Sequence, residues 1–77
     1  NLNEIKVTKI FKWLKSQNIS EKEMLKVFNC GVGFCIITTK ENKKKVGKYF
    51  PKKYKPYQIG EIIKNSSSVK TYGKIRW

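Results

Sequence analysis

Apolar residues near the start of the chain recur at the spacing of an amphipathic helix. After a short entry segment of residues 1–6, they follow the i, i+3, i+4, i+7 pattern at Val7, Ile10, Phe11 and Leu14. Trp13 lies off the centre of this stripe. It therefore either covers a neighbouring domain or packs at the edge of its own.

A second helix is predicted from a capping box. Ser20 stands three residues before Glu23, so the hydroxyl can accept a bond from the Glu23 backbone N–H and the carboxylate can reach back to Ser20. The helix is expected to end near Asn29, where glycines begin. Its wide apolar face consists of Met24, Leu25, Val27 and Phe28.

The most apolar stretch of the chain, Val32–Thr38, follows a glycine-containing turn and predicts a central strand covered on both faces. Thr38 or Thr39 can cap a third helix, which Pro51 stops. The apolar side of that helix is supplied by Val46, Tyr49 and Phe50.

Alternation with a period of two predicts two further strands, Tyr57–Ile63 and Val69–Trp77, paired as a hairpin through the polar loop Asn65–Ser68. A right-handed crossover would place Val32–Thr38 parallel to Tyr57–Ile63. The predicted fold class is therefore α+β, a small helix-helix-strand-helix-strand-strand sandwich with a mixed sheet. One sheet face lacks a covering layer, so residues 1–77 are expected to form a single partial domain that self-associates.

The charge of the chain is strongly positive. Eighteen basic residues, of which seventeen are Lys, face five Glu, and the net charge is +13. Such a charge attracts polyanions, but base-specific recognition and bidentate phosphate binding favour Arg. Most of the lysines are therefore expected to form a solvated surface, with nucleic acid bound only by non-specific charge attraction. A free-standing basic nucleic-acid-binding domain remains the alternative.

Residues suited to catalysis are scarce. The chain has no His and no Asp, and its five Glu are dispersed. Glu61 is interpreted as an edge or salt-linked residue rather than an acid in a cleft. No catalytic residue and no metal ligand set is therefore predicted from the residues themselves.

The two thiols, Cys30 and Cys35, are expected to be free, because an extended intervening chain would place them on opposite faces. Cys30 lacks a His partner and follows a helix C-terminus, so a structural role is favoured over a nucleophilic one. Free thiols, and the absence of a signal peptide or a membrane-length apolar run, favour a cytoplasmic protein without a membrane partner. The chain begins with Asn1, as a fragment or a processed product would.

Four strings resemble, in order, the C-terminal part of the phosphoribosylformylglycinamidine cyclo-ligase family, also called aminoimidazole ribonucleotide synthetase. They are Ile10–Lys15 (IFKWLK), Ile19–Met24 (ISEKEM), Phe28–Phe34 (FNCGVGF) and Ile59–Ile62 (IGEI). The third string is the specific one. It also argues against other members of the same ATP-binding superfamily, such as hydrogenase-maturation proteins or thiamine-phosphate kinases.

The resemblance implies a cytoplasmic, homodimeric purine-biosynthesis ligase. The family uses ATP and magnesium to cyclise formylglycinamidine ribonucleotide to aminoimidazole ribonucleotide, releasing ADP and phosphate. An N-terminal ATP-binding domain precedes an α/β C-terminal domain, of which this chain resembles the last part. The family's nucleotide- and metal-binding carboxylates lie upstream, so the chain alone is expected to be inactive and to bind neither cofactor.

Three residues of this chain match the family's motif and are candidates for shaping the substrate side of the cleft: Asn29, Gly31 and Gly33. A glycine pair in this position precedes the expected strand rather than opening a helix. It therefore lacks the geometry of a phosphate-binding loop. The resemblance assigns no catalytic step to any of the three.

Overall fold

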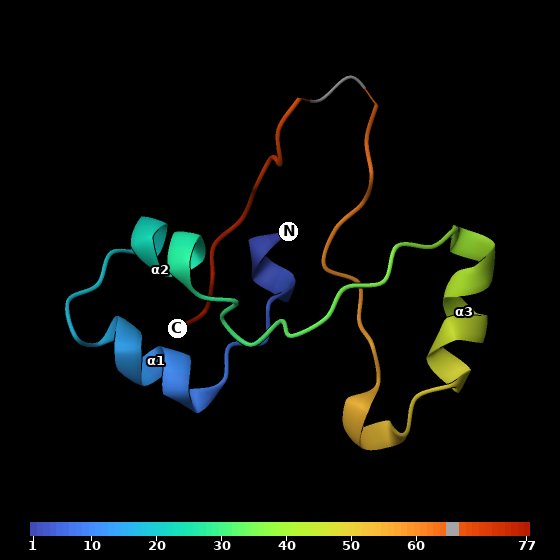
Figure 1. The fold of residues 1–77 in the computed structure, drawn as a ribbon, viewed down its shortest axis with the longest axis horizontal. Helices are drawn as coiled ribbons and strands as arrows, with labels where there is room; N and C mark the ends of the chain where they lie inside the picture. Colours follow the sequence, from blue (N-terminus) through green and yellow to red (C-terminus); the bar gives the residue numbers. More distant parts are fainter. Residues whose placement is uncertain (65–66) are drawn as a thin grey trace.

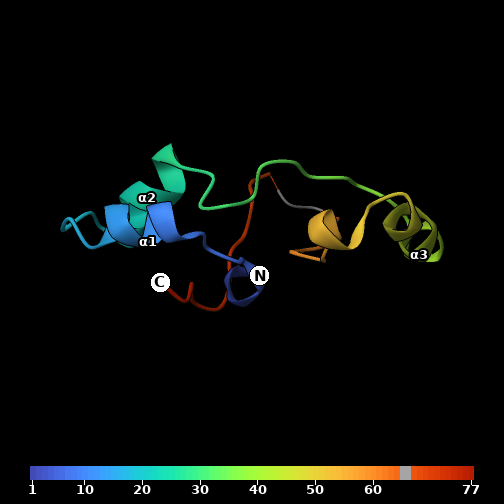
Figure 2. The same cartoon turned by 90° about the horizontal axis from the view of Figure 1, so that it is seen from below.

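A computed structural model describes residues 1–64 and 67–77 of the chain. In this part of the chain the elements are two 3₁₀ helices and three α-helices, in the order η1 (Leu2–Glu4), α1 (Lys9–Lys15), α2 (Glu21–Val27), α3 (Lys40–Lys48) and η2 (Lys52–Tyr54). The molecule is flat, with extents of 41 × 35 × 17 Å. Helices α1 and α2 lie at one end, and α3 and η2 lie at the other (Figures 1 and 2).

The three predicted helices are present, and two of them begin at a predicted cap. The Ser20 hydroxyl accepts a hydrogen bond from the Glu23 backbone N–H at 3.2 Å, which confirms this half of the capping box. The Thr39 hydroxyl accepts one from the Asn42 N–H at 3.3 Å. Helix α2 ends slightly earlier than predicted, because Phe28 already has extended backbone angles.

The predicted α+β sandwich with a mixed sheet is wrong. None of the described residues lies in a strand. The segments predicted as strands form no ladder in the described part of the chain; they are Val32–Thr38, Tyr57–Ile63 and Val69–Trp77. Apolar and alternating patterns indicate an extended backbone, but they do not provide the neighbouring strand on which a ladder depends. Within the predicted loop, residues 65 and 66 lie outside the described part of the chain.

The N-terminal residues occupy the place where the hairpin was predicted. The Asn1 amine donates a 2.7 Å hydrogen bond to the Ile59 carbonyl, and the Leu2 N–H donates a 2.9 Å bond to the Tyr72 carbonyl. Figure 1 shows the N-terminus between the two C-terminal extended segments. These segments are therefore bridged by the N-terminal residues instead of pairing with each other.

Asn3 holds the last segment in place. Its side-chain oxygen accepts a 3.0 Å hydrogen bond from the Lys74 N–H. Gly73, with a φ of +79°, lies so close that an added Cβ would come within 2.6 Å of the Asn3 amide nitrogen. Gly73 lies within the segment predicted as the last strand, but it forms a turn around the Asn3 side chain.

A small core joins the N-terminal segment, α2, the turn after α2 and the C-terminal segment. Four apolar side chains are buried in it: Leu2, Met24, Cys30 and Ile75. The Phe11 and Phe28 rings pack beside it with centroids 5.9 Å apart. The Trp77 indole N–H donates a 3.0 Å hydrogen bond to the Glu21 carboxylate, which ties the C-terminal segment to α2.

Outside this core the chain is open. Its radius of gyration is 14.2 Å, whereas a compact domain of this length has about 11.5 Å. Its accessible surface is 7182 Å², against about 4,900 Å² for a compact monomer of this mass. None of the helices in the described ranges is long and apolar enough to cross a membrane.

Candidate functional site

The turn after α2 carries the three residues that match the family's motif. The Asn29 side-chain oxygen accepts a 3.0 Å hydrogen bond from the Gly31 N–H, and the Asn29 carbonyl accepts one of 2.9 Å from the Val32 N–H. Cys30 and Gly31 both have positive φ, at +53° and +109°. Two consecutive residues in this region reverse the chain sharply, and the Asn29 amide stabilises the reversal.

The two glycines of this turn have different surroundings. A Cβ on Gly31 would come within 2.7 Å of the Lys6 carbonyl oxygen and 3.3 Å of the Thr8 side chain. Gly33 is exposed and has no atom within 4 Å of the corresponding position. Close packing therefore requires glycine at position 31. Nothing in the surrounding structure requires it at position 33.

Cys30 is buried, which agrees with the structural role that the sequence favoured. Its sulfur lies 3.7 Å from the carbonyl oxygens of Met24 and Phe28, toward which the thiol donates. Burial raises the pKa of the Cys30 thiol because the charged thiolate would lose its hydration. A buried thiol with a raised pKa is a poor nucleophile. Cys35 is free and exposed.

We predict that the two thiols react at very different rates. Iodoacetamide at neutral pH is expected to modify Cys35 at least about tenfold faster than Cys30, because alkylation requires an accessible thiolate. Mass spectrometry of peptides from a time course measures both rates in one sample. Denaturant provides the control, since it should bring the two rates together. Equal rates in the folded chain would contradict the burial of Cys30.

A second feature is an open hollow of about 390 Å³ beside the IGEI string. The Gln58 amide nitrogen donates to the Glu61 carboxylate at 3.3 Å, and its oxygen accepts a 2.9 Å hydrogen bond from the Lys43 ammonium. The partner of Glu61 in this bond is therefore a neutral amide. The predicted position at the edge of a sheet is wrong, because none of the described residues lies in a strand. The lining of the hollow includes Asn1, Glu4, Tyr57 and Tyr72.

Lys6 connects the Asn29–Gly33 turn with Tyr57, which lines the hollow. The sequence did not predict this connection. The Lys6 carbonyl oxygen packs against Gly31, and its N–H donates a 3.2 Å hydrogen bond to the Tyr57 hydroxyl. Its ammonium group lies 4.5 Å from the centre of the Tyr57 ring, a cation–π distance. Residues 1–6 showed no periodicity. A contact between Lys6 and Gly31, which lies far along the chain, leaves no pattern in the sequence around Lys6.

The donor groups suited to a metal ion are dispersed. Among residues 1–64 and 67–77, no three His, Cys, Asp or Glu side chains gather closely enough to hold one. Magnesium bound to a nucleotide is usually held by carboxylates together with phosphate oxygens. In the described part of the chain, the Asn29–Gly33 turn offers one exposed side-chain amide, and the hollow is lined by two carboxylate residues, Glu4 and Glu61.

Comparison with known families decides the affiliation. The family described as AIR synthase related protein, C-terminal domain, matches residues 2–72. The chain belongs to this family. The match confirms the resemblance that the motif strings predicted, and it includes both the Asn29–Gly33 turn and the IGEI string of the AIR synthase related family. No solved structure matches the chain.

Two of the curated relatives carry the name of the cyclo-ligase, and a third is a trifunctional protein. Phosphoribosylformylglycinamidine cyclo-ligase of Pyrococcus horikoshii is 36% identical over 66 residues, covering 83% of this chain and 20% of the relative. The enzyme of the same name from Staphylococcus aureus strain JH9 is 39% identical over 62 residues, covering 78% and 18%.

The trifunctional purine biosynthetic protein adenosine-3 of Gallus gallus is 36% identical over 75 residues, covering 92% of this chain and 8% of the relative. The chain therefore spans between 8% and 20% of the length of these three relatives. The chain is thus similar to one segment of each of these relatives.

Proposed function

We propose that this chain forms the C-terminal part of a cytoplasmic phosphoribosylformylglycinamidine cyclo-ligase. The family's reaction joins an internal nitrogen of formylglycinamidine ribonucleotide to the amide carbon activated by ATP, closing an imidazole ring with release of ADP and phosphate. The FNCGVGF string at Phe28–Phe34, together with the match over residues 2–72, carries the proposal.

In this proposal, ATP and magnesium bind to a separate N-terminal ATP-binding domain of the longer polypeptide. The absence of His and Asp from the sequence, and the dispersed carboxylates, support that division of roles. Asn29, Gly31 and Gly33 shape the substrate side of the cleft. The exposure of Asn29 and Gly33 supports this role, since a side chain or backbone that meets a substrate must be accessible.

A further part of the proposal concerns partners: this chain packs against the N-terminal domain of its own polypeptide and, in a homodimer, against a second copy. Exposed apolar side chains support it. Phe34 is 84% exposed and Val69 is 93% exposed. Phe34, Ile36 and Ile37 are all exposed within one short segment, and a contiguous apolar surface often marks an interface. The open shape of the chain, with its excess surface over a compact monomer, is also that of a segment covered by other parts of an assembly.

The proposal is tested with a chimera. Residues 2–72 replace the matching segment of the Staphylococcus aureus cyclo-ligase, and turnover of formylglycinamidine ribonucleotide is followed through the release of ADP. The chimera is expected to be active with ATP and magnesium, whereas the 77-residue chain alone is expected to show no turnover. A folded, dimeric chimera without activity would contradict the assignment. Turnover by the isolated chain would contradict the location of the catalytic groups elsewhere.

A further inference from the structure

More than half of the net charge lies in one short part of the molecule. Residues 40–55, here called the basic arm, comprise α3, a turn and η2. The arm holds eight Lys and one Glu, a net charge of +7 out of +13 for the whole chain. All eight lysine side chains are exposed: Lys40, Lys43, Lys44, Lys45, Lys48, Lys52, Lys53 and Lys55.

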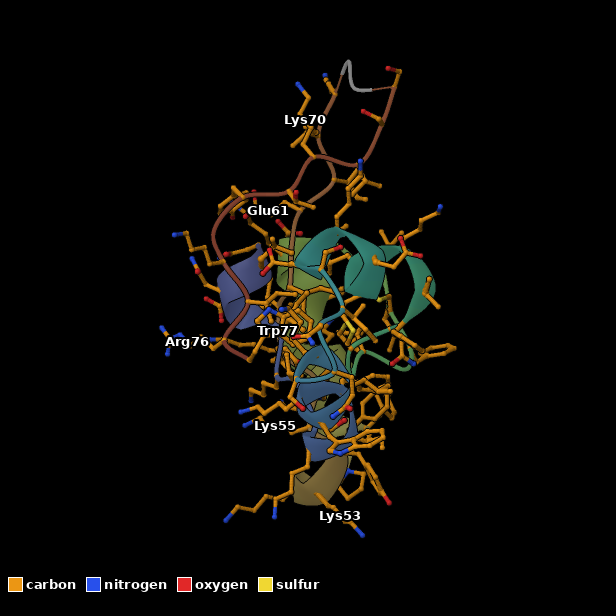
Figure 3. All side chains as sticks on the ribbon, turned by 90° about the vertical axis from the view of Figure 1, so that its left-hand side faces the viewer. Lys53, Lys55, Glu61, Lys70, Arg76 and Trp77 are labelled. Atoms are coloured by element: carbon orange, nitrogen blue, oxygen red, sulfur yellow. The ribbon has the colours of Figure 1, made fainter. Side chains whose placement is uncertain are left out.

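The basic arm lies apart from the core. It forms one end of the flat molecule, opposite α1 and α2 (Figures 1 and 2), and a hydrogen bond from Lys43 to Gln58 links it to the neighbouring extended segment. Figure 3 shows the Lys53 and Lys55 side chains extending away from the ribbon. Lysines held together in this way repel one another, and a bound polyanion relieves that repulsion.

Two tyrosines stand among the lysines. Tyr49, directly after α3, is 88% exposed, and Tyr54, in η2, is 65% exposed. The Lys53 ammonium lies 5.4 Å from the centre of the Tyr54 ring. Accessible aromatic rings interleaved with cations are typical of surfaces on which nucleobases stack while the phosphates meet the lysines.

Other polyanions fit the basic arm less well. A membrane-bound helix needs a continuous apolar face with residues such as Leu, Phe or Trp, but within α3 the apolar side consists of Val46 beside Gly47. A duplex read by sequence would call for Arg and other bidentate groups, and the arm contains no Arg. An acidic protein partner would give the exposed tyrosine rings no stacking role.

We propose that the basic arm binds single-stranded nucleic acid without sequence preference, through lysine contacts to phosphates and stacking of bases on Tyr49 and Tyr54. This is an interaction additional to the proposed enzymatic role. It differs from diffuse charge attraction because it depends on where the lysines lie and on the two rings.

The first test compares two variants of equal net charge. In the arm variant, Lys44, Lys45 and Lys52 are changed to Gln, and in the matched variant Lys9, Lys12 and Lys22, exposed residues of α1 and α2, are changed to Gln. Each variant loses three charges from +13. Gln has nearly the helix propensity of Lys, so both should keep their helices, as circular dichroism will show.

Binding is measured by the fluorescence anisotropy of labelled oligo(U) and oligo(dT) of about 12 nucleotides, between about 50 and 200 mM salt. The arm variant is expected to bind about tenfold more weakly, with a salt slope smaller by about 2, and the matched variant less than about twofold more weakly. Equal losses in the two variants would overturn the proposal. So would tighter binding to a duplex, to phosphatidylserine vesicles or to polyglutamate than to the single strands.

The second test concerns stacking. Tyr49→Ala is expected to weaken binding about fivefold or more, since it removes one stacking platform. Tyr72→Ala is the matched control, because Tyr72 is likewise exposed, at 65%, but lies outside the arm, and its loss should leave binding unchanged. Equal affinities of the two tyrosine variants would overturn the stacking mechanism. Similar affinities for oligo(U) and oligo(dT) would support recognition of features that RNA and DNA share.

Discussion

Met24→Ala is expected to lower the free energy of unfolding by about 2–5 kcal/mol, the usual cost of truncating a fully buried Met. Met24 has no exposed surface, and its carbonyl accepts from the Cys30 thiol. Among the described residues, the Met24 side chain is one of four apolar side chains that are buried. Small domains are stable by as little as about 5 kcal/mol, so at the upper end of this range the truncation would unfold about half of the population.

Urea unfolding, followed through the helical circular dichroism signal, measures this effect. Leu25→Ala is the matched control, since Leu25 is the next residue of the same helix and 37% of its surface is exposed. That change should cost about 1 kcal/mol or less. If both variants unfolded at the same urea concentration, the core would not be centred on Met24.

The second large effect is expected from Gly31→Ala. Its φ of +109° is strained for any residue with a Cβ, at about 1–3 kcal/mol. The new methyl group would also meet the Lys6 carbonyl oxygen at 2.7 Å. Because the obstacle is backbone, either the turn or the N-terminal segment must move. We expect the variant to lose the packing between them as well as stability.

Gly33→Ala is the matched control for this prediction, because a Cβ at position 33 meets no atom within 4 Å. Its unfolding midpoint should stay close to that of the parent chain. Protection of the Lys6 backbone amide, which bonds to the Tyr57 hydroxyl, should fall in Gly31→Ala and remain in Gly33→Ala when measured by hydrogen exchange. Unchanged protection in both variants would show that the turn does not rest on the N-terminal segment.

The helices could be predicted because their signals are local. The Ser20 and Thr39 caps each involve residues three apart, and the structure contains both bonds. The sheet was predicted wrongly because strand pairing joins residues far apart in the sequence. An alternating pattern such as that of Val69–Trp77 does not specify which other segment lies beside it. Only its last part, at Ile75 and Trp77, is buried or partly buried; Val69 is almost fully exposed.

In the candidate site too, the local turn could be predicted and the long-range contacts could not. The motif string predicted a turn at Asn29–Gly33, and a turn stabilised by the Asn29 amide is present. The sequence could not predict that Lys6 would pack against Gly31 while bonding to Tyr57, since 51 residues separate Lys6 and Tyr57. The roles of Asn29, Gly31 and Gly33 toward a substrate remain predictions that the chimera and its variants can test.

The hydrogen bond between Trp77 and Glu21, across 56 residues, has a consequence for the order of assembly. Helix α2 is synthesised before Ile75 and Trp77, the two residues of the C-terminal segment that are buried or partly buried. The Glu21 carboxylate therefore has no Trp77 partner until the intervening chain has been made. Until then the core lacks Ile75, and apolar residues of α2 are exposed in a way that chaperones are suited to shield.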